Sequence, residues 1–248
     1  MTAESTGLME PMLPALGNKE LEDLAMELAK KSSALAGTMH PAVRKSIGNL
    51  VRSMNCYYSN LIEGHDTHPR DIDKALAGDF SKDPEKRNLQ LEAKAHIEVQ
   101  QLIDSDLAPA IKPSGEFMRW VHHEFCSRLP EELLWVENPD TGERIEVIAG
   151  AFRQREVAVG RHIPPLAENL DRFMQRFEEA YDPAKLSQVQ QVIAIAASHY
   201  RLVWIHPFLD GNGRVVRLFS HAWLLETEIG SSLWSVSRGL ARNVEEYK

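Results

Sequence analysis

Apolar residues recur every three to four positions over most of the chain, which is the period of an amphipathic α-helix. The predicted helices begin at capping residues or prolines, and several of them end at a glycine. Two long helices are predicted first, from Asn18 to Gly37 and from His40 to Gly64. Further helices are predicted to begin at Thr67, Asp83, Ser114, Pro164, Asp182 and Val215, and a last one to include Arg238 and Arg242.

The period shortens between Leu133 and His162, where apolar and polar residues alternate as they do along a β-strand. Asp140, Thr141 and Gly142 form a turn signal inside this stretch. The alternating apolar positions are Ile145, Val147 and Ala149, followed by Phe152, Val157 and Val159. The stretch therefore predicts the only β structure of the chain, as one or two hairpins.

Three segments carry more specific expectations. Residues 1–17 show no period and are expected to form a loose arm. The helix that starts after Asp83 has a side rich in Glu, Lys and Gln, which is typical of a solvated face. The helix that ends at His206 is expected to bury Leu186, Val189, Ile193, Ala196, Tyr200 and Val203.

Composition limits the class of protein. The chain has 248 residues, with 28 Lys and Arg against 36 Asp and Glu, a formal net charge of −8. This balance and the lack of a long basic run argue against a nucleic-acid-binding surface. Neither a membrane-spanning run nor a signal sequence is recognisable, so we expect a soluble cytoplasmic protein. Cys56 and Cys126 lie in apolar helical segments and predict two reduced core thiols.

The chemistry concentrates in residues 206–217, which read HPFLDGNGRVVR. Gly211, Asn212 and Gly213 predict a tight turn at the start of a helix, where free N–H groups and the helix dipole attract an anion. Two arginines follow, and Arg214, Arg217 and His221 share one helical face. Arginines in this position suit phosphate oxygens.

Two further side chains complete the predicted site. Asp210 is a hard oxygen ligand beside the anion site, which suits Mg²⁺ bound to phosphates. His206 can accept a proton near neutral pH. A base, a metal carboxylate, an anion site and two arginines together indicate phosphate-transfer chemistry. In contrast, His122 and His123 have no carboxylate at ligand spacing and are interpreted as structural or surface residues.

The stretch also resembles the signature of the Fic family, H-P-F-x-[DN]-G-N-G-R-x-x-R, and meets every specified position. The resemblance extends from about Ser59 to Leu240. It implies a mainly α fold, a Fic-type helical bundle with a small β-hairpin flap. Residues 1–66 would form an N-terminal arm and helices, and residues 67–248 the catalytic core, in one compact unit. Many family members continue farther, so the charged end at 245–248 is compatible with a trimmed chain.

The resemblance implies transfer of AMP from ATP to a hydroxyl of a target protein. His206 would accept the proton of the target Ser, Thr or Tyr, and Asp210 would hold Mg²⁺, with Mn²⁺ as an alternative metal. Nucleotide binding falls to Gly211, Asn212, Gly213, Arg214 and Arg217. The segment Gly150–Val159 resembles the Fic flap, which aligns the target by strand addition, here through Arg155, Val157 and Val159. The target is another protein or the chain itself, and a homo-oligomer is compatible with the sequence.

A second motif lies far upstream. Ser59-Asn60-Leu61-Ile62-Glu63-Gly64 resembles the [ST]-x-x-x-E-[GN] motif of the Fic inhibitory helix. A carboxylate at a helix C-terminus opposes the dipole and requires a compensating cation. In the family this cation is the second signature arginine, here Arg217. We therefore expect Glu63, held by Ser59, to pair with Arg217 and inhibit the enzyme.

Two other functions stay open. In a deAMPylase, Glu63 would orient a water molecule that removes AMP from a modified target. In a nucleotide-binding regulatory module there would be no reaction at all, and the intact His206 argues against that reading. Transfer of phosphate or phosphocholine has no support from departures in the signature.

Overall fold

The structure, a computed structural model, describes residues 4–65, 67–138, 141–230 and 232–247. Ten α-helices and one two-stranded antiparallel sheet occur in these residues, which confirms the predicted mainly α fold. The helices are α1 (Lys19–Gly37), α2 (Pro41–Glu63), α3 (Pro69–Leu76), α4 (Pro84–Asp104), α5 (Gly115–Cys126), α6 (Leu170–Ala180), α7 (Gln188–Ile205), α8 (Asn212–Glu226), α9 (Val236–Ala241) and α10 (Val244–Tyr247).

Capping residues set most helix ends where the sequence predicts them. The Asn18 side chain accepts from the Leu21 amide at the start of α1, and the Ser114 side chain accepts from the Phe117 amide at the start of α5. His40 begins α2, and Gly64 ends it with φ 87°. The predicted caps of α3 and α7 are wrong. His68, rather than Thr67, caps α3, and α7 begins only at a capping box between Ser187 and Gln190.

The helix after Pro164 also begins later than expected. A 3₁₀ turn, Ala167–Asn169, precedes α6, and a second 3₁₀ turn, Pro183–Lys185, precedes α7. The last predicted helix is present as α9, which contains Arg238 and has Arg242 as its C-cap.

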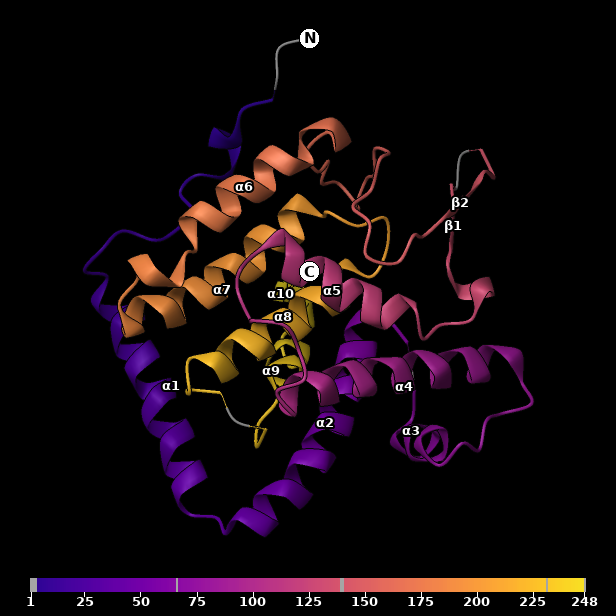
Figure 1. The fold of residues 1–248 in the computed structure, drawn as a ribbon, viewed down its shortest axis with the longest axis horizontal. Coiled ribbons are helices and arrows are strands. Elements are labelled where there is room, and N and C mark those ends of the chain that lie inside the picture. The colour runs from indigo at the N-terminus through magenta and orange to yellow at the C-terminus, as the bar shows by residue number, and fades with distance from the viewer. Residues whose placement is uncertain (1–3, 66, 139–140, 231, 248) are drawn as a thin grey trace.

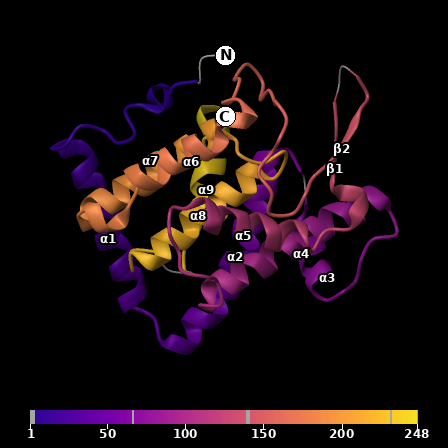
Figure 2. The ribbon, with the colours of Figure 1, turned by 45° about the horizontal axis from the view of Figure 1, so that its top comes forward.

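Helices α7 and α8 run through the middle of the molecule, and α5, α6, α4 and α2 surround them (Figures 1 and 2). The predicted buried face of α7 is wrong in part. Leu186 and Val203 pack against the core, but Tyr200 is 62% exposed and Ala196 is also exposed. The buried residues of α7 are Ala194, Ile195, Ser198, His199, Leu202 and Ile205. Small and polar side chains let α7 pack closely on α8, and this outweighs the larger apolar residues on the other face.

The N-terminal arm is docked, contrary to expectation. Met9 and Met12 are buried in the main core, and the Tyr181 hydroxyl donates to the Met12 carbonyl at 2.7 Å. Burial of two methionines therefore fixes a segment whose sequence shows no helical or strand period. A short 3₁₀ helix, Thr6–Met9, lies within it.

One hairpin forms from β1 (Trp135–Glu137) and β2 (Arg144–Glu146) and projects from the helical body (Figures 1 and 2). Thr141 and Gly142 lie in its turn, while Asp140 lies outside the described residues. No second hairpin forms in the described part of residues 150–162. Only a bridge between Val159 and His162 is present there.

The flap segment lacks strands because its hydrogen-bonding groups are committed elsewhere. The Arg153 amide donates to the Pro207 carbonyl at 2.9 Å, and the Arg153 side chain donates to the Arg155 carbonyl at 2.9 Å. The Arg153 amide and the Arg155 carbonyl are then unavailable for hydrogen bonds to a neighbouring strand. A hydrophobic alternation in the sequence does not reveal such long-range partners.

Cys56 and Cys126 are buried free thiols, as predicted. In the described part of the chain, no helix is both long and apolar enough to cross a bilayer. The division into residues 1–66 and 67–248 stays a prediction, and its boundary falls at a residue outside the described ones. Helix α2 packs against α4 and α9, so the N-terminal helices contact the rest of the chain extensively.

Candidate active site

The signature forms the junction between α7 and α8. His206 ends α7 in the left-handed region, with φ 50° and ψ 61°, and Gly211 precedes α8 with φ 77°. The chain reverses its direction between these two residues. The free amides of the first turn of α8 and the positive end of its dipole consequently face the loop.

Asn212 closes the loop internally. Its Oδ1 accepts from the Phe208 amide at 2.9 Å, and its Nδ2 donates to the Phe208 carbonyl at 2.8 Å. The resemblance implies that Asn212 binds the nucleotide. The structure places its side chain on Phe208, where it shapes the loop, and nucleotide binding by Asn212 stays a prediction.

Phe208 and His122 support the loop from below. Phe208 is fully buried and stacks on the His122 ring, with centroids 4.1 Å apart and planes 6° apart. The Gly150 amide donates to His122 Nδ1 at 2.8 Å, and His122 Nε2 lies 3.2 Å from the Asp210 carbonyl oxygen. Burial lowers the pKa of His122 to about 4, so the ring is neutral and donates through Nε2. His122 is structural, as predicted, and it joins the flap to the signature.

The imidazole of His206 is suited to accept a proton. Burial, with a smaller contribution from the charge of Arg153, lowers its pKa to about 4. The ring is therefore neutral at physiological pH, which is the state that a general base requires.

Asp210 is exposed beside the first turn of α8. Among the described residues, no group of three or more His, Cys, Asp or Glu side chains could hold a metal ion. A single carboxylate fits Mg²⁺, because this ion keeps several waters and takes other ligands from substrate phosphates. The donor set therefore fits a metal that binds together with a nucleotide.

Arg217 is 1% exposed and contacts the last turn of α2. Its Nε donates to Ser59 Oγ at 2.9 Å, and its Nη2 donates to Glu63 Oε1. The contact that the inhibitory motif requires is thus present. It joins Glu63 and Arg217, which are 154 positions apart in the sequence.

The Glu63 carboxylate lies directly over Gly213, the second residue of α8. A methyl group at Gly213 would collide with Glu63 Oε1. Gly213 therefore leaves space for an anion at the helix start, and the carboxylate fills that space. Burial raises the pKa of Glu63, but the Arg217 charge and hydrogen bond lower it more, so its pKa lies below 4.5.

The first signature arginine is also paired. Arg214 Nη2 donates to Glu92 Oε2 at 2.8 Å, and the same oxygen lies 3.1 Å from His65 Nδ1. His221, on the same face of α8, contacts Asp104 at 2.7 Å. The three residues that share this face therefore all meet acceptors from α2 or α4.

This arrangement corrects the interpretation of α4. Gln90, His96 and Gln100 are buried, and Glu92 and Asp104 face α8. Glu92, His96, Gln100 and Asp104 recur every four residues, so one polar stripe of α4 is buried rather than solvated. That regular spacing is the signal that could have identified Glu92 from the sequence.

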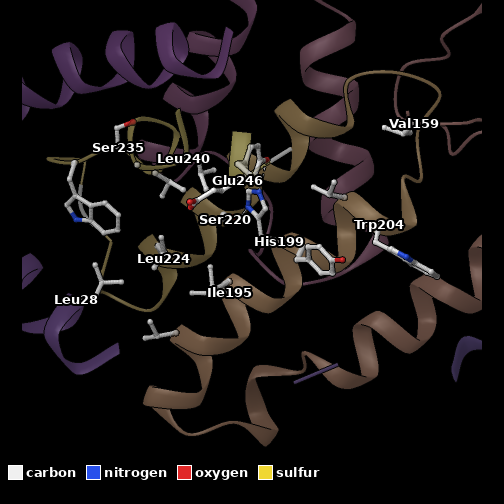
Figure 3. A pocket seen from close by; sticks show the side chains of 18 of the residues that line it. Leu28, Val159, Ile195, His199, Trp204, Ser220, Leu224, Ser235, Leu240 and Glu246 are labelled. Atoms are coloured by element: carbon white, nitrogen blue, oxygen red, sulfur yellow. Dashed lines mark hydrogen bonds between the residues drawn. The ribbon is translucent and has the colours of Figure 1, made fainter. Parts of the chain in front are cut away.

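A cavity of about 890 Å³ lies next to the site, between α7, α8, α9 and α10 (Figure 3). It is lined mostly by apolar side chains, with His199 and Tyr247 among them. His199 contacts Ser220 Oγ at 2.8 Å and Tyr247 Oη at 2.9 Å. Burial raises the pKa of Tyr247, although the charge of Arg217 opposes this. Tyr247 therefore lies both in the cavity lining and within the electrostatic reach of the signature arginine.

A neutral histidine beside the N-terminus of a helix is an arrangement that suits transfer of a phosphate-containing group. Residues 114–224 match the model of the Fic/DOC family. A stretch of 140 residues is 31% identical to "Protein adenylyltransferase Fic" of Drosophila erecta. It covers 55% of this chain and 26% of the relative, so the chain spans about a quarter of that protein's length.

Solved structures show the same fold. A Fic domain containing signaling protein from Bacteroides thetaiotaomicron is 19% identical, with a TM-score of 0.64 over 91% of this chain and 79% of that one. A Fic family protein from Desulfovibrio desulfuricans is 16% identical, with a TM-score of 0.67 over 95% of this chain and 66% of that one.

Proposed function

We propose that the protein is a protein adenylyltransferase that Glu63 inhibits. The relatives named adenylyltransferases support the reaction class. The observation that carries the regulatory part is the Glu63 carboxylate over Gly213, bound to the arginine of the signature. A phosphate group and this carboxylate require the same space and the same guanidinium.

In the proposed reaction, His206 takes the proton of a target Ser, Thr or Tyr hydroxyl. The hydroxyl oxygen forms a bond to the α-phosphorus of ATP, and the bond from that phosphorus to the bridging oxygen breaks. Pyrophosphate leaves, and AMP stays on the target. Mg²⁺, held by Asp210 with phosphate oxygens, would neutralise charge on the phosphates. The helix start at Gly211–Gly213 and the two arginines position the nucleotide.

The cavity beside Tyr247 offers an apolar space for the nucleoside, and its volume lies within the usual range for ligand pockets. Val157 is the flap position that a target segment could pair with. No backbone hydrogen bond of Val157 is found in the part of the chain that the structure describes, whereas the Val159 amide and carbonyl pair with His162 and the Arg155 carbonyl accepts from Arg153. A target segment can pair with such an edge by strand addition.

The test uses two labels. Wild-type protein and Glu63→Gly are incubated with Mg²⁺ and ATP labelled at the α-phosphate or, as a matched control, at the γ-phosphate. We expect α-label on the protein or on a lysate protein, stronger with Glu63→Gly, and no γ-label. Transfer of γ-label instead would contradict adenylylation, and absence of both labels would contradict the transfer reaction.

The deAMPylase alternative has its own readout. Protein labelled by Glu63→Gly is purified and mixed with unlabelled wild type. Release of AMP that depends on Glu63 would support removal as the dominant activity. Glu63 is 33% exposed at its side chain, so a water molecule can reach it.

A further inference from the structure

The backbone of His206 is unusual in two respects. It has φ 50°, a conformation that costs energy for a residue with a side chain. It also precedes Pro207, and a residue before proline normally prefers an extended backbone. The Leu202 carbonyl accepts from the His206 amide at 3.0 Å, which fixes only the helix side of this residue. The loop side needs another support.

Arg153 supplies this support from the flap. Its Nε donates to the His206 carbonyl at 2.9 Å, and its backbone amide donates to the Pro207 carbonyl at 2.9 Å. The other guanidinium nitrogens donate to the Arg155 carbonyl at 2.9 Å and to the Pro165 carbonyl. One side chain thus joins the end of α7, the flap and the segment before α6.

This guanidinium is buried at a considerable energetic cost. Its side chain is 0% exposed, and its partner Glu156 is 3.7 Å away and 59% exposed. Burial lowers the pKa of Arg153 from its ordinary value, which reflects the cost of a charge removed from water. The planar fork of arginine serves three carbonyls in different directions, whereas the single ammonium of lysine cannot.

We propose that Arg153 is a positioning residue that holds the left-handed backbone of His206 to the flap, so that the base and the target-binding segment form one unit. The inference rests on the proposed adenylyltransferase function. It assigns Arg153 no contact with ATP, whose predicted site lies at the start of α8.

The charge of Arg153 gives a second, independent consequence. Besides burial, the groups that act on the His206 pKa are Arg153 and His162, which lower it, and Asp210 and the Val203 carbonyl, which raise it. Removal of the Arg153 charge should therefore raise the pKa of His206. On acidification, His206 would then become protonated, and stop acting as a base, at a higher pH than in the wild type.

The kinetic test compares Arg153→Gln and Arg153→Lys in the Glu63→Gly background. Misplacement of a base by about 1 Å can cost on the order of a hundredfold, so we expect kcat to fall about ten- to a hundredfold in both variants. The Kd of ATP should change less than about twofold, because the nucleotide groups of α8 are unaltered. Arg128→Gln, which removes a half-buried arginine paired with Glu98 and Glu124, is the matched control and should leave kcat unchanged.

The second measurement is an NMR titration of the His206 imidazole, identified by the signal that disappears in His206→Ala. We expect the pKa to rise in Arg153→Gln and to stay near the wild-type value in Arg153→Lys, which keeps the charge. Lysine would thus restore the pKa but not kcat. If Arg153 had a purely structural role, its variants would lower the folded fraction, but the His206 pKa and the kcat of the folded protein would not change.

The outcomes separate the two proposals. If Glu63→Gly transfers no label, the proposed function fails, while the titration still tests Arg153. Full kcat in Arg153→Lys, or an unchanged His206 pKa in Arg153→Gln, would overturn the positioning role. Circular dichroism checks the fold, and if Arg153→Gln unfolds, the kcat of Arg153→Lys decides.

Discussion

The two ends of the signature are held in opposite ways. The nucleotide half, Gly211–Arg217, has its anion space and both arginines occupied by carboxylates from α2 and α4. The base half, His206–Asp210, is supported from behind by Arg153, His122 and Asn212, and Asp210 stays exposed. If the protein is the inhibited adenylyltransferase that we propose, this difference places regulation at the nucleotide, while the base is already in place.

The largest effect is expected where the base half is broken. His206→Ala removes the proton acceptor, so transfer should fall by about 10²- to 10⁴-fold while ATP binding persists. Labelled ATP measures transfer in the Glu63→Gly background, and calorimetry measures binding. His123→Ala, an exposed neighbour on α5, serves as control. Near-normal transfer by His206→Ala would remove this residue from the role of base.

Asp210→Ala should have the next largest effect. Loss of a metal carboxylate removes charge stabilisation of several kcal/mol, so Mg²⁺-dependent transfer should fall on the order of a hundredfold or more. A Mg²⁺ titration of transfer in the Glu63→Gly background measures this. Asp171→Ala changes an exposed carboxylate of α6 and should leave the titration unchanged. An unaltered Mg²⁺ response of Asp210→Ala would count against the metal site.

The inhibitory pair should show an asymmetry. A charge-assisted contact is worth roughly 1.5–3 kcal/mol, so Glu63→Gly should raise transfer on the order of ten- to a hundredfold. Arg217→Ala breaks the same contact but removes a predicted nucleotide ligand, so transfer should fall. Both variants are compared with labelled ATP and Mg²⁺. Equal activation by both would show that Arg217 contributes nothing to ATP binding.

The pH dependence of inhibition follows from the lowered pKa of Glu63. A depressed carboxyl pKa means that the ion pair is complete above pH 4.5 and is lost only as the pH falls through the still lower folded value. The activity ratio of Glu63→Gly to wild type should therefore stay constant from pH 8 to about pH 5. A ratio that declines near pH 7 would assign the inhibition to another group.

The smallest effect is expected at Glu92. Glu92→Gln releases Arg214 for phosphate, but this pair is one of several contacts and a neutral acceptor remains. We expect ATP affinity to rise about two- to fivefold, in the range of a single partly solvated ion pair. Calorimetry with wild type and Glu92→Gln measures it, and Glu98→Gln on the same helix is the control. Weaker ATP binding would mean that Glu92 orders Arg214 for the nucleotide.

Local signals in the sequence predicted the helices and most of their caps. Asn18, His40, Gly64 and Ser114 act through neighbours within a few positions, so the sequence contains the whole interaction. The signature residues were also predicted, because they form one continuous turn and helix start. The pairing of Glu63 with Arg217 came from a family pattern, since no local rule connects residues 154 positions apart.

Residues that act over long distances could not be predicted in this way. Arg153 looks like any charged residue in an alternating segment, and its buried acceptors come from α7 and from the segment before α6. Glu92 looked solvated because its helix is rich in charge. The exposed face of α7 was mispredicted for a related reason. Burial depends on which partner helix approaches, and small residues allowed α8 to approach the other side.

Glu63 and the arginine it binds belong to a single chain, which affects how the proposed inhibition would respond to the amount of protein. An intramolecular partner acts at an effective concentration that is independent of how many molecules are present. Dilution therefore does not release Glu63, and a higher expression level does not strengthen its hold. The fraction of open molecules depends instead on the supply of a competing anion such as ATP, or on any event that displaces the last turn of α2.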